Sequence, residues 1–255
     1  LFGAMALTAG LALAACGSSQ SSNADKTYSY IFVSNPDTLD YITSTRDSTS
    51  SITTNLIDGL LENDQYGNLI PSMAESWTVS KDGLTYTYKI RQGAKWYTSE
   101  GEEYADVTAH DFVTGLKYAA DKKAENLYLV QDSIKGLADY VEGKSSDFGT
   151  VGVKAVDDYT LQYTLNQPET YWNSKTTASI LSPVNEAFLK SKGDDFGSVT
   201  PSSILSNGPY LFKSFTSKSL IEFDKNPNYW DKDNVKIEKV KLSFFDGSDQ
   251  DSIAR

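Results

Sequence analysis

The sequence predicts a mixed α/β fold with an α+β layout, and three observations indicate it. Segments of alternating apolar and polar residues predict β-strands, and segments with apolar residues three or four positions apart predict helices. The two kinds are interspersed without a regular strand–helix–strand repeat, which favours mixed lobes over a doubly wound sheet. With 255 residues, 39% of them hydrophobic, the chain is long enough for one large domain or two smaller ones.

The first half of the predicted fold opens with a strand. Residues 27–34 alternate aromatic with small or polar side chains, as a half-buried strand does. Apolar residues recur at helical spacing over 49–61, which predicts a helix. A Lys-Asp-Gly turn at 81–83 then separates two strands, predicted at 77–79 and 86–90.

The rest of the chain continues the mixture. Thr108 and Asp111 approximate a capping box, which predicts that a helix with one apolar face begins there. Further elements are predicted from the same patterns: strands at 151–156 and 161–165, a short helix at 184–190, and strands at 210–215, 220–224 and 240–244.

The N-terminal segment differs from everything after it. Residues 1–24 contain no charged residue, and 1–15 are mainly Leu, Ala, Gly and Met, like the apolar part of a secretory signal. About 15 residues fall short of the roughly 20 that a permanent membrane span needs. Ala14 and Ala15 precede Cys16, where the composition changes to Gly and Ser, an order that resembles a lipobox.

We therefore expect residues 1–15 to be an N-terminally clipped signal peptide and Cys16 to carry a lipid. Residues 16–26, rich in Ser and Gly, would form a flexible tether on the outer face of the cell membrane. The alternative is a buried cysteine in an apolar helix.

The composition excludes several classes of function. A net charge of −11 argues against nucleic acid as a partner. One Cys and one His are too few for a Cys/His zinc site or a disulfide framework. No Gly-rich phosphate-binding loop is present, and the segment 224–233 lacks the calcium-loop spacing. We expect neither a metal nor a cofactor.

No catalytic signature is present. His110 falls in the first turn of the Thr108 helix with no nucleophile or orienting carboxylate nearby in sequence, so we expect a surface histidine. Acidic pairs at 102–103, 157–158 and 194–195 would suit a glycosidase, but adjacent carboxylates usually point apart. We predict a protein that is not an enzyme, with a surface glycosidase as the alternative.

Five sequence blocks carry a family resemblance. In order, they are Leu69–Trp77, then 82–96 with Asp82-Gly83-Leu84-Thr85-Tyr86 and Gly93-Ala94-Lys95-Trp96, then Val107–Phe112, Asn207–Tyr210 and Asn226–Trp230. Together they resemble the cluster-C, or family 5, extracellular solute-binding proteins, which are oligopeptide-binding lipoproteins of ABC importers of the Opp, Ami and Ali type. One departure is a longer acidic loop after Trp96, where the family often has a short Trp-x-Asp-Gly turn.

The resemblance implies a periplasmic-binding-protein-like type II fold, with two lobes around a hinge and an extra inserted domain. Residues 27–55 and 171–255 would form the hinge-side lobe, and 56–170 the inserted domain. The second lobe would follow later in the chain and be missing here. Residues 249–255 resemble an unfinished helix, as expected of a fragment.

The resemblance also implies the function and a set of site residues. A monomeric receptor would bind an extended oligopeptide between its lobes and deliver it to a permease and its ATPase subunits. The implied peptide-binding residues are Thr45, Arg46, Asp47, Ser48, Val130, Gln131, Ser206, Asn207 and Gly208. Arg46 would pair with a ligand carboxylate, and Asp47 with an amine.

Each of these assignments has an alternative interpretation. The segment 45–48 also fits an ordinary polar loop, and 206–208 a structural turn. Receptors of the same fold take other solutes, so a nickel complex, a sugar oligomer or a peptide pheromone stays open as ligand.

Overall fold

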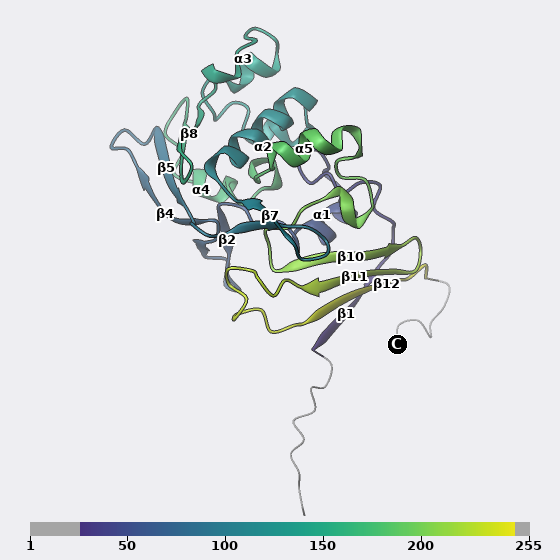
Figure 1. The fold of residues 1–255 in the computed structure, drawn as a ribbon. Helices are drawn as coiled ribbons and strands as arrows, with labels where there is room; N and C mark the ends of the chain where they lie inside the picture. Colours follow the sequence, from purple (N-terminus) through teal and green to yellow (C-terminus); the bar gives the residue numbers. More distant parts are fainter. Residues whose placement is uncertain (1–25, 248–255) are drawn as a thin grey trace, which may run out of the picture.

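The computed structural model describes residues 26–247, and two four-stranded sheets form most of its β-structure (Figure 1). The predicted signal peptide, the lipidated Cys16, nearly all of the tether and the helix at 249–255 lie outside the described residues. Within residues 26–247, no helix is long and apolar enough to cross a membrane.

The first sheet, called here the β1 sheet, joins the start of the chain to its end. Its strands, in spatial order, are β1 (Thr27–Phe32), β12 (Lys239–Phe244), β11 (Leu220–Lys225) and β10 (Tyr210–Thr216). β1 runs parallel to β12, and the other pairs are antiparallel. These strands confirm the alternating patterns in the sequence.

The expected half-burial of β1 is wrong. Tyr28 and Tyr30 are 53% and 60% exposed, and Val33 just beyond the strand is 68% exposed. Of the predicted apolar face, only Phe32 is buried. β1 is the edge of its sheet, and the stacked rings of Tyr28 and Tyr30 border a hollow instead of the core.

The second sheet, the β5 sheet, is antiparallel throughout. Its strands are β4 (Ala74–Val79), β5 (Thr85–Ile90), β9 (Thr160–Thr164) and β8 (Val153–Asp157), in that spatial order. Its inner face buries Tyr88 and Tyr163, whose rings meet edge to face, and Trp172 packs against Tyr163. The predicted strands of this region are confirmed.

The longest helix, α2 (Ala109–Lys122), begins at the predicted capping box. The backbone N–H of Thr108 donates to the Asp111 carboxylate at 2.8 Å, and the indole of Trp96 donates to the same oxygen at 3.1 Å. Phe112 and other apolar residues of one face are buried, and the helix packs against β8. The capping box therefore also anchors a buried tryptophan.

The predicted helix at 49–61 is too long. Helix α1 (Asp47–Thr53) ends early, because Thr54 and Asn55 are weak helix formers whose side chains bond back to the carbonyls of Ser50 and Ser51. Of the apolar residues that follow, Leu56, Leu60 and Leu61 are buried, and Ile57 is half-buried.

Short elements complete the fold. The sequence patterns did not predict two hairpins, which are β2 (Leu61–Asn63) with β3 (Leu69–Pro71), and β6 (Lys95–Tyr97) with β7 (Glu103–Asp106). The short helices are α3 (Leu137–Val141), α4 (Trp172–Lys175) and α5 (Glu186–Lys192), and the 3-10 turns are η1 (Glu125–Leu129), η2 (Phe148–Thr150), η3 (Ser179–Leu181), η4 (Gly193–Asp195) and η5 (Pro201–Ser203). α5 lies at the short helix predicted at 184–190.

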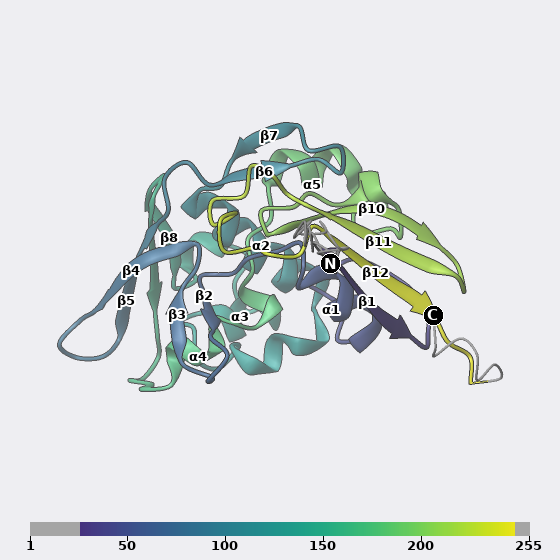
Figure 2. The ribbon, with the colours of Figure 1, turned by 90° about the horizontal axis from the view of Figure 1, so that it is seen from below.

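The two large sheets lie on opposite sides of the molecule, with α1 between them (Figure 2). The β1 sheet takes its strands from 27–32 and 210–244, whereas the β5 sheet takes its strands from 74–164. Each sheet therefore draws on one of the two segments that the resemblance separates.

Candidate functional site

The loop Thr45–Ser48, which leads into α1, keeps its side chains accessible. Its first three residues are exposed, and the fourth is half-buried. Three hydrogen bonds fix the loop from behind: the Arg46 N–H donates to Ser44 Oγ, this hydroxyl donates to Thr49 Oγ1, and Thr49 donates to the carbonyl of Thr38. A fixed backbone with open side chains is what a recognition loop needs.

An apolar hollow of about 650 Å³ lies on one side of this loop. Asp47 and Ser48 border it together with Tyr28, Tyr30 and Val33, as well as apolar residues of β11 and β12. Because its walls are mainly apolar, it suits apolar side chains, from a ligand or from another protein segment.

A second hollow, the cationic hollow, lies on the other side of the loop and has a volume of about 450 Å³. Thr45 and Arg46 border it, facing Lys122, Lys123 and Glu125 at the end of α2 and the start of η1. The loop Thr45–Ser48 thus separates an apolar hollow from a charged one.

The charged side chains of the loop have only weak internal partners. Arg46 Nε lies 3.3 Å from Asp37 Oδ2, and both side chains are more than two-thirds exposed. The Thr45 hydroxyl donates to Glu125 at 3.3 Å. Exposed ion pairs of this kind contribute little to stability, so the groups can exchange partners at low cost.

The predicted contacts at Ser206–Gly208 are instead internal. All three residues are buried. The Asn207 side chain accepts from the Asp58 N–H at 2.9 Å and donates to the Asp58 carbonyl at 3.1 Å. Ser206 Oγ donates to the carbonyl of Leu56, and a Cβ on Gly208 would lie 2.8 Å from that same carbonyl group. Their polar atoms serve the fold, as the structural-turn alternative requires, and a contact of these residues with a ligand stays a prediction.

Asp58 is the centre of this arrangement. Its buried carboxylate accepts hydrogen bonds from the Tyr229 hydroxyl at 2.7 Å and, more weakly, from the Trp230 indole at 3.3 Å. Burial raises the pKa of Asp58 to about 6, against the lowering effect of these donors. We call Asp58, Asn207, Gly208, Tyr229 and Trp230 the Asp58 junction.

The Asp58 junction explains two of the sequence blocks that carry the resemblance. The block at 207–210 and the block at 226–230 meet there, and the guanidinium of Arg91 stacks 3.7 Å from the centre of the Trp230 ring. Sequence reasoning missed Asp58, although a lone carboxylate within an apolar run was a usable signal.

The remaining predicted contacts lie near η1. Val130 is fully buried, so its side chain cannot touch a ligand in this conformation. The side chain of Val130 is used by the core, and a ligand contact at this position stays a prediction. Gln131 is half-buried in the turn that follows.

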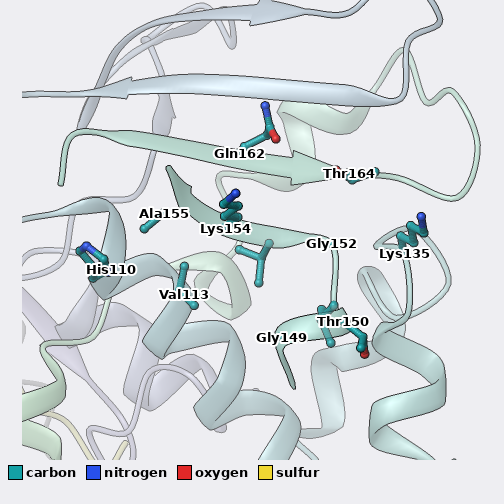
Figure 3. A pocket seen from close by; sticks show the side chains of 12 residues that line it. His110, Val113, Lys135, Gly149, Thr150, Gly152, Lys154, Ala155, Gln162 and Thr164 are labelled. Atoms are coloured by element: carbon teal, nitrogen blue, oxygen red, sulfur yellow. The ribbon is translucent and has the colours of Figure 1, made fainter. Parts of the chain in front are cut away.

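A third hollow, of about 600 Å³, runs along β8 and the start of α2 (Figure 3). Figure 3 shows His110 and Lys135 near opposite ends of the strand. His110 Nε2 lies 3.2 Å from Asp158 Oδ1, and both side chains are well exposed. Backbone and hydroxyl donors lower the pKa of neighbouring Asp157. The hollow brings no activated nucleophile beside His110.

The carboxylates whose pKa is raised do not form a catalytic pair either. Asp58 and Asp111, each with a pKa raised to about 6 by burial, are hydrogen-bonded, and burial raises the pKa of Glu62 to about 7. None of the three borders these hollows. Among residues 26–247 there is no group of three His, Cys, Asp or Glu side chains able to hold a metal ion.

Residues 68–254 match the bacterial extracellular solute-binding proteins, family 5 middle. The chain belongs to this family. Membership in family 5 confirms the predicted fold class and the predicted class of protein, a solute-binding protein and not an enzyme.

Two curated relatives and one solved structure illustrate the similarity. The chain is 66% identical to the oligopeptide-binding protein AliB of Streptococcus pneumoniae over 251 residues, covering 98% of this chain and 38% of AliB. It is 61% identical to AmiA of the same species over 256 residues, covering 99% of this chain and 39% of AmiA. The structure of Listeria monocytogenes OppA bound to peptide has a TM-score of 0.79 at 31% identity, over 87% of this chain and 43% of OppA. The chain thus spans well under half of each of these proteins.

Proposed function

We propose that this sequence is part of a longer receptor that captures extended oligopeptides outside the cell and delivers them to an ABC permease with its ATPase subunits. AliB and AmiA are named oligopeptide-binding proteins, and the Listeria OppA structure contains a bound peptide, which supports the proposal. The observation that carries it is the loop Thr45–Ser48, held from behind and open between two hollows of different chemistry.

In this proposal an extended peptide lies along the loop. Main-chain hydrogen bonds, as in an added β-strand, give affinity that does not depend on ligand side chains. Arg46 exchanges its exposed partner Asp37 for a ligand carboxylate, and Asp47 takes an amine or a basic side chain. Because these groups lose only a weak surface interaction, their desolvation is the main cost of binding.

The apolar hollow gives a reason to expect a further part of the chain. Tyr28, Tyr30 and Val33 leave a contiguous apolar surface exposed beside β1, which is unusual unless another segment covers it. We propose that the remainder of the longer protein covers this surface and carries the second lobe, which closes over the peptide. The division into 27–55 with 171–255 and 56–170 belongs to this proposal.

The anchoring part of the proposal rests on the sequence. Cys16 is lipidated after removal of the segment 1–15, and the segment 16–26 tethers a monomeric receptor to the outer face of the membrane. Mass spectrometry of the receptor isolated from membranes tests it: a diacylglyceryl adduct on Cys16 is expected, and a soluble product with a free Cys16 contradicts it.

A thermal-shift screen of the full-length protein tests the ligand class. Mixed oligopeptides are expected to raise the unfolding temperature, because a ligand that binds only the folded state stabilises it. The matched solutes are a nickel chelate, oligosaccharides and a peptide pheromone. A response to the chelate or the oligosaccharides alone contradicts the peptide assignment, and a response to the pheromone alone narrows the role to signalling.

A further inference from the structure

The cationic hollow has a charge balance opposite to that of the whole chain. It is bordered by three cations, Arg46, Lys122 and Lys123, and by one carboxylate, Glu125. The chain as a whole carries a formal charge of −11. A locally positive cavity in an acidic protein concentrates anions against the general field.

The two lysines have no carboxylate partner within residues 26–247. Lys122 lies 5.8 Å from the centre of the Tyr118 ring, and neither lysine takes part in an ion pair there. Asp121, the residue before them, is paired with Lys117 and accepts from the Tyr140 hydroxyl. The positive charge of the hollow is therefore not cancelled from this side.

The loop side of the hollow adds no carboxylate to its lining. Asp40 does not border the hollow, and its buried carboxylate accepts hydrogen bonds from the N–H groups of Ile42 and Thr43 and the hydroxyls of Thr43 and Tyr118. Asp37 holds Arg46 only through an exposed contact. Glu125 is thus the one carboxylate that borders the hollow among the residues described.

Lys123 is the C-cap residue of α2, a position that does not require a lysine for the helix to end. It has a left-handed backbone with φ of 52° and ψ of 50°, and its N–H caps α2 on the carbonyls of Ala119 and Ala120. Glycine or asparagine is the usual residue in this conformation. The positive charges of the two lysines also stabilise the negative, C-terminal end of the helix. If this were their only role, replacing them would change the unfolding temperature and nothing else.

We propose that the cationic hollow receives a carboxylate of the bound peptide and that Lys122 and Lys123 make the receptor prefer such peptides. The proposal rests on the proposed function, because the ligand must lie along Thr45–Ser48 to reach the hollow. The carboxylate is either an acidic side chain or the C-terminus. Arg46 reaches the same space from the loop, so the anion would be held from both sides.

Calorimetry on the full-length protein tests the preference. The probes are alanine-based octapeptides with Glu or Gln at one position, each with a free or amidated C-terminus. We expect the Glu peptide, or the free-acid peptide, to bind about 2- to 5-fold more tightly than its neutral match, with the difference shrinking at high salt. The Glu/Gln pair and the acid/amide pair separate the two sources of the carboxylate.

The double variant Lys122→Gln/Lys123→Gly removes both charges while giving the helix end its preferred residue. It should lose the preference yet still bind neutral peptides and unfold at a similar temperature. The control Lys135→Gln/Lys154→Gln, in the hollow of Figure 3, should keep the preference.

The outcomes separate the two proposals. A preference that persists in the Lys122/Lys123 variant, or no preference while neutral peptides bind, overturns this inference and leaves the proposed function standing. A variant that changes only the unfolding temperature assigns the lysines to the helix end alone and also overturns it. Failure of every peptide to bind overturns the proposed function, and this inference with it.

Discussion

The loop Thr45–Ser48 and the Asp58 junction use polar residues in opposite ways. In the loop, the charged side chains are exposed and weakly paired. At the junction, the polar atoms of Asp58 and Asn207 are buried and bonded to residues far away in the sequence. Two of the blocks that carry the resemblance meet at the junction, although it borders no hollow described here. A strongly matching motif therefore marks the fold here, and the proposed ligand site lies in a plainer loop.

The largest effect on stability is expected at the junction. In Gly208→Ala the new Cβ would lie 2.8 Å from the backbone carbonyl of Leu56. This carbonyl cannot move away without displacing the backbone on either side of it. We expect the free energy of unfolding to fall by about 3 kcal/mol, measured by urea unfolding.

Gly93→Ala is the matched control, because nothing lies within 4 Å of its added Cβ and only the positive φ of 82° opposes it. It should lose about 1 kcal/mol. Equal losses in the two variants would show that close packing at Gly208 does not matter, and would weaken the contrast between junction and loop.

A second prediction asks whether the loop suffices for binding. Residues 25–255 alone would contain the loop without the proposed second lobe, so we expect peptide affinity at least about 100-fold weaker than that of the full-length receptor, or about 2.7 kcal/mol. Calorimetry measures it, with near-ultraviolet circular dichroism to show that the fragment is folded. Micromolar affinity for the folded fragment would mean that this half of the cleft is enough.

The third prediction sharpens the contrast from the loop side. Arg46→Ala should weaken binding of a peptide with a free carboxylate by about 10-fold. Because Arg46 and Asp37 are exposed, the free energy of unfolding should change by less than about 0.5 kcal/mol. Arg46→Lys, which keeps the charge, should recover part of the affinity. Loss of stability without loss of affinity would assign Arg46 to the fold.

The fourth prediction concerns pH. Burial raises the pKa of Asp58 from 3.8 to about 6, so between these values the folded state holds a proton that the unfolded state has lost. The resulting stabilisation is complete below pH 3.8 and is lost as the pH rises through 6. Asp58 should therefore add about 1 kcal/mol to the free energy of unfolding when the pH falls from 7 to 5.

Asp58→Asn isolates this effect, since the amide oxygen can still accept from Tyr229 but does not titrate. Its gain in stability between pH 7 and pH 5 should be smaller by that amount. Further gains would come from Asp111 and Glu62, because burial also raises their pKa values, to about 6 and about 7. If the free energy of unfolding of Asp58→Asn depended on pH as that of the parent protein does, the proton would bind to a group other than Asp58.

Much of the fold followed from the sequence because its signals are local. Alternation over five or more residues located β5, β9, β10, β11 and β12, and the capping box located α2. The hairpins β2–β3 and β6–β7 escaped because strands of three or four residues are too short to show a period. The end of α1 was not predicted, because the side chain of Asn55 bonds to the backbone and so competes with the helix.

The site was predicted only in part, and the reason is also physical. Thr45–Ser48 was located by resemblance, and its exposure agrees with a role in binding. The two hollows could not be located, because the loop meets Lys123 and Tyr30 only after distant segments fold together. The burial of Ser206–Gly208 and Val130 could not be predicted, because polarity or position in a motif does not report burial.

The parallel pairing of β1 with β12 has a consequence for how the protein is made. Lys26 beside β1 and Glu238 beside β12 are in contact although they stand 212 positions apart. At about 5 to 20 residues per second, a ribosome needs roughly 10 to 40 s to add the partner strand after the first one. During that interval the tyrosines of β1 have no sheet to join, so holding the emerging chain unfolded until β12 arrives should favour its correct assembly.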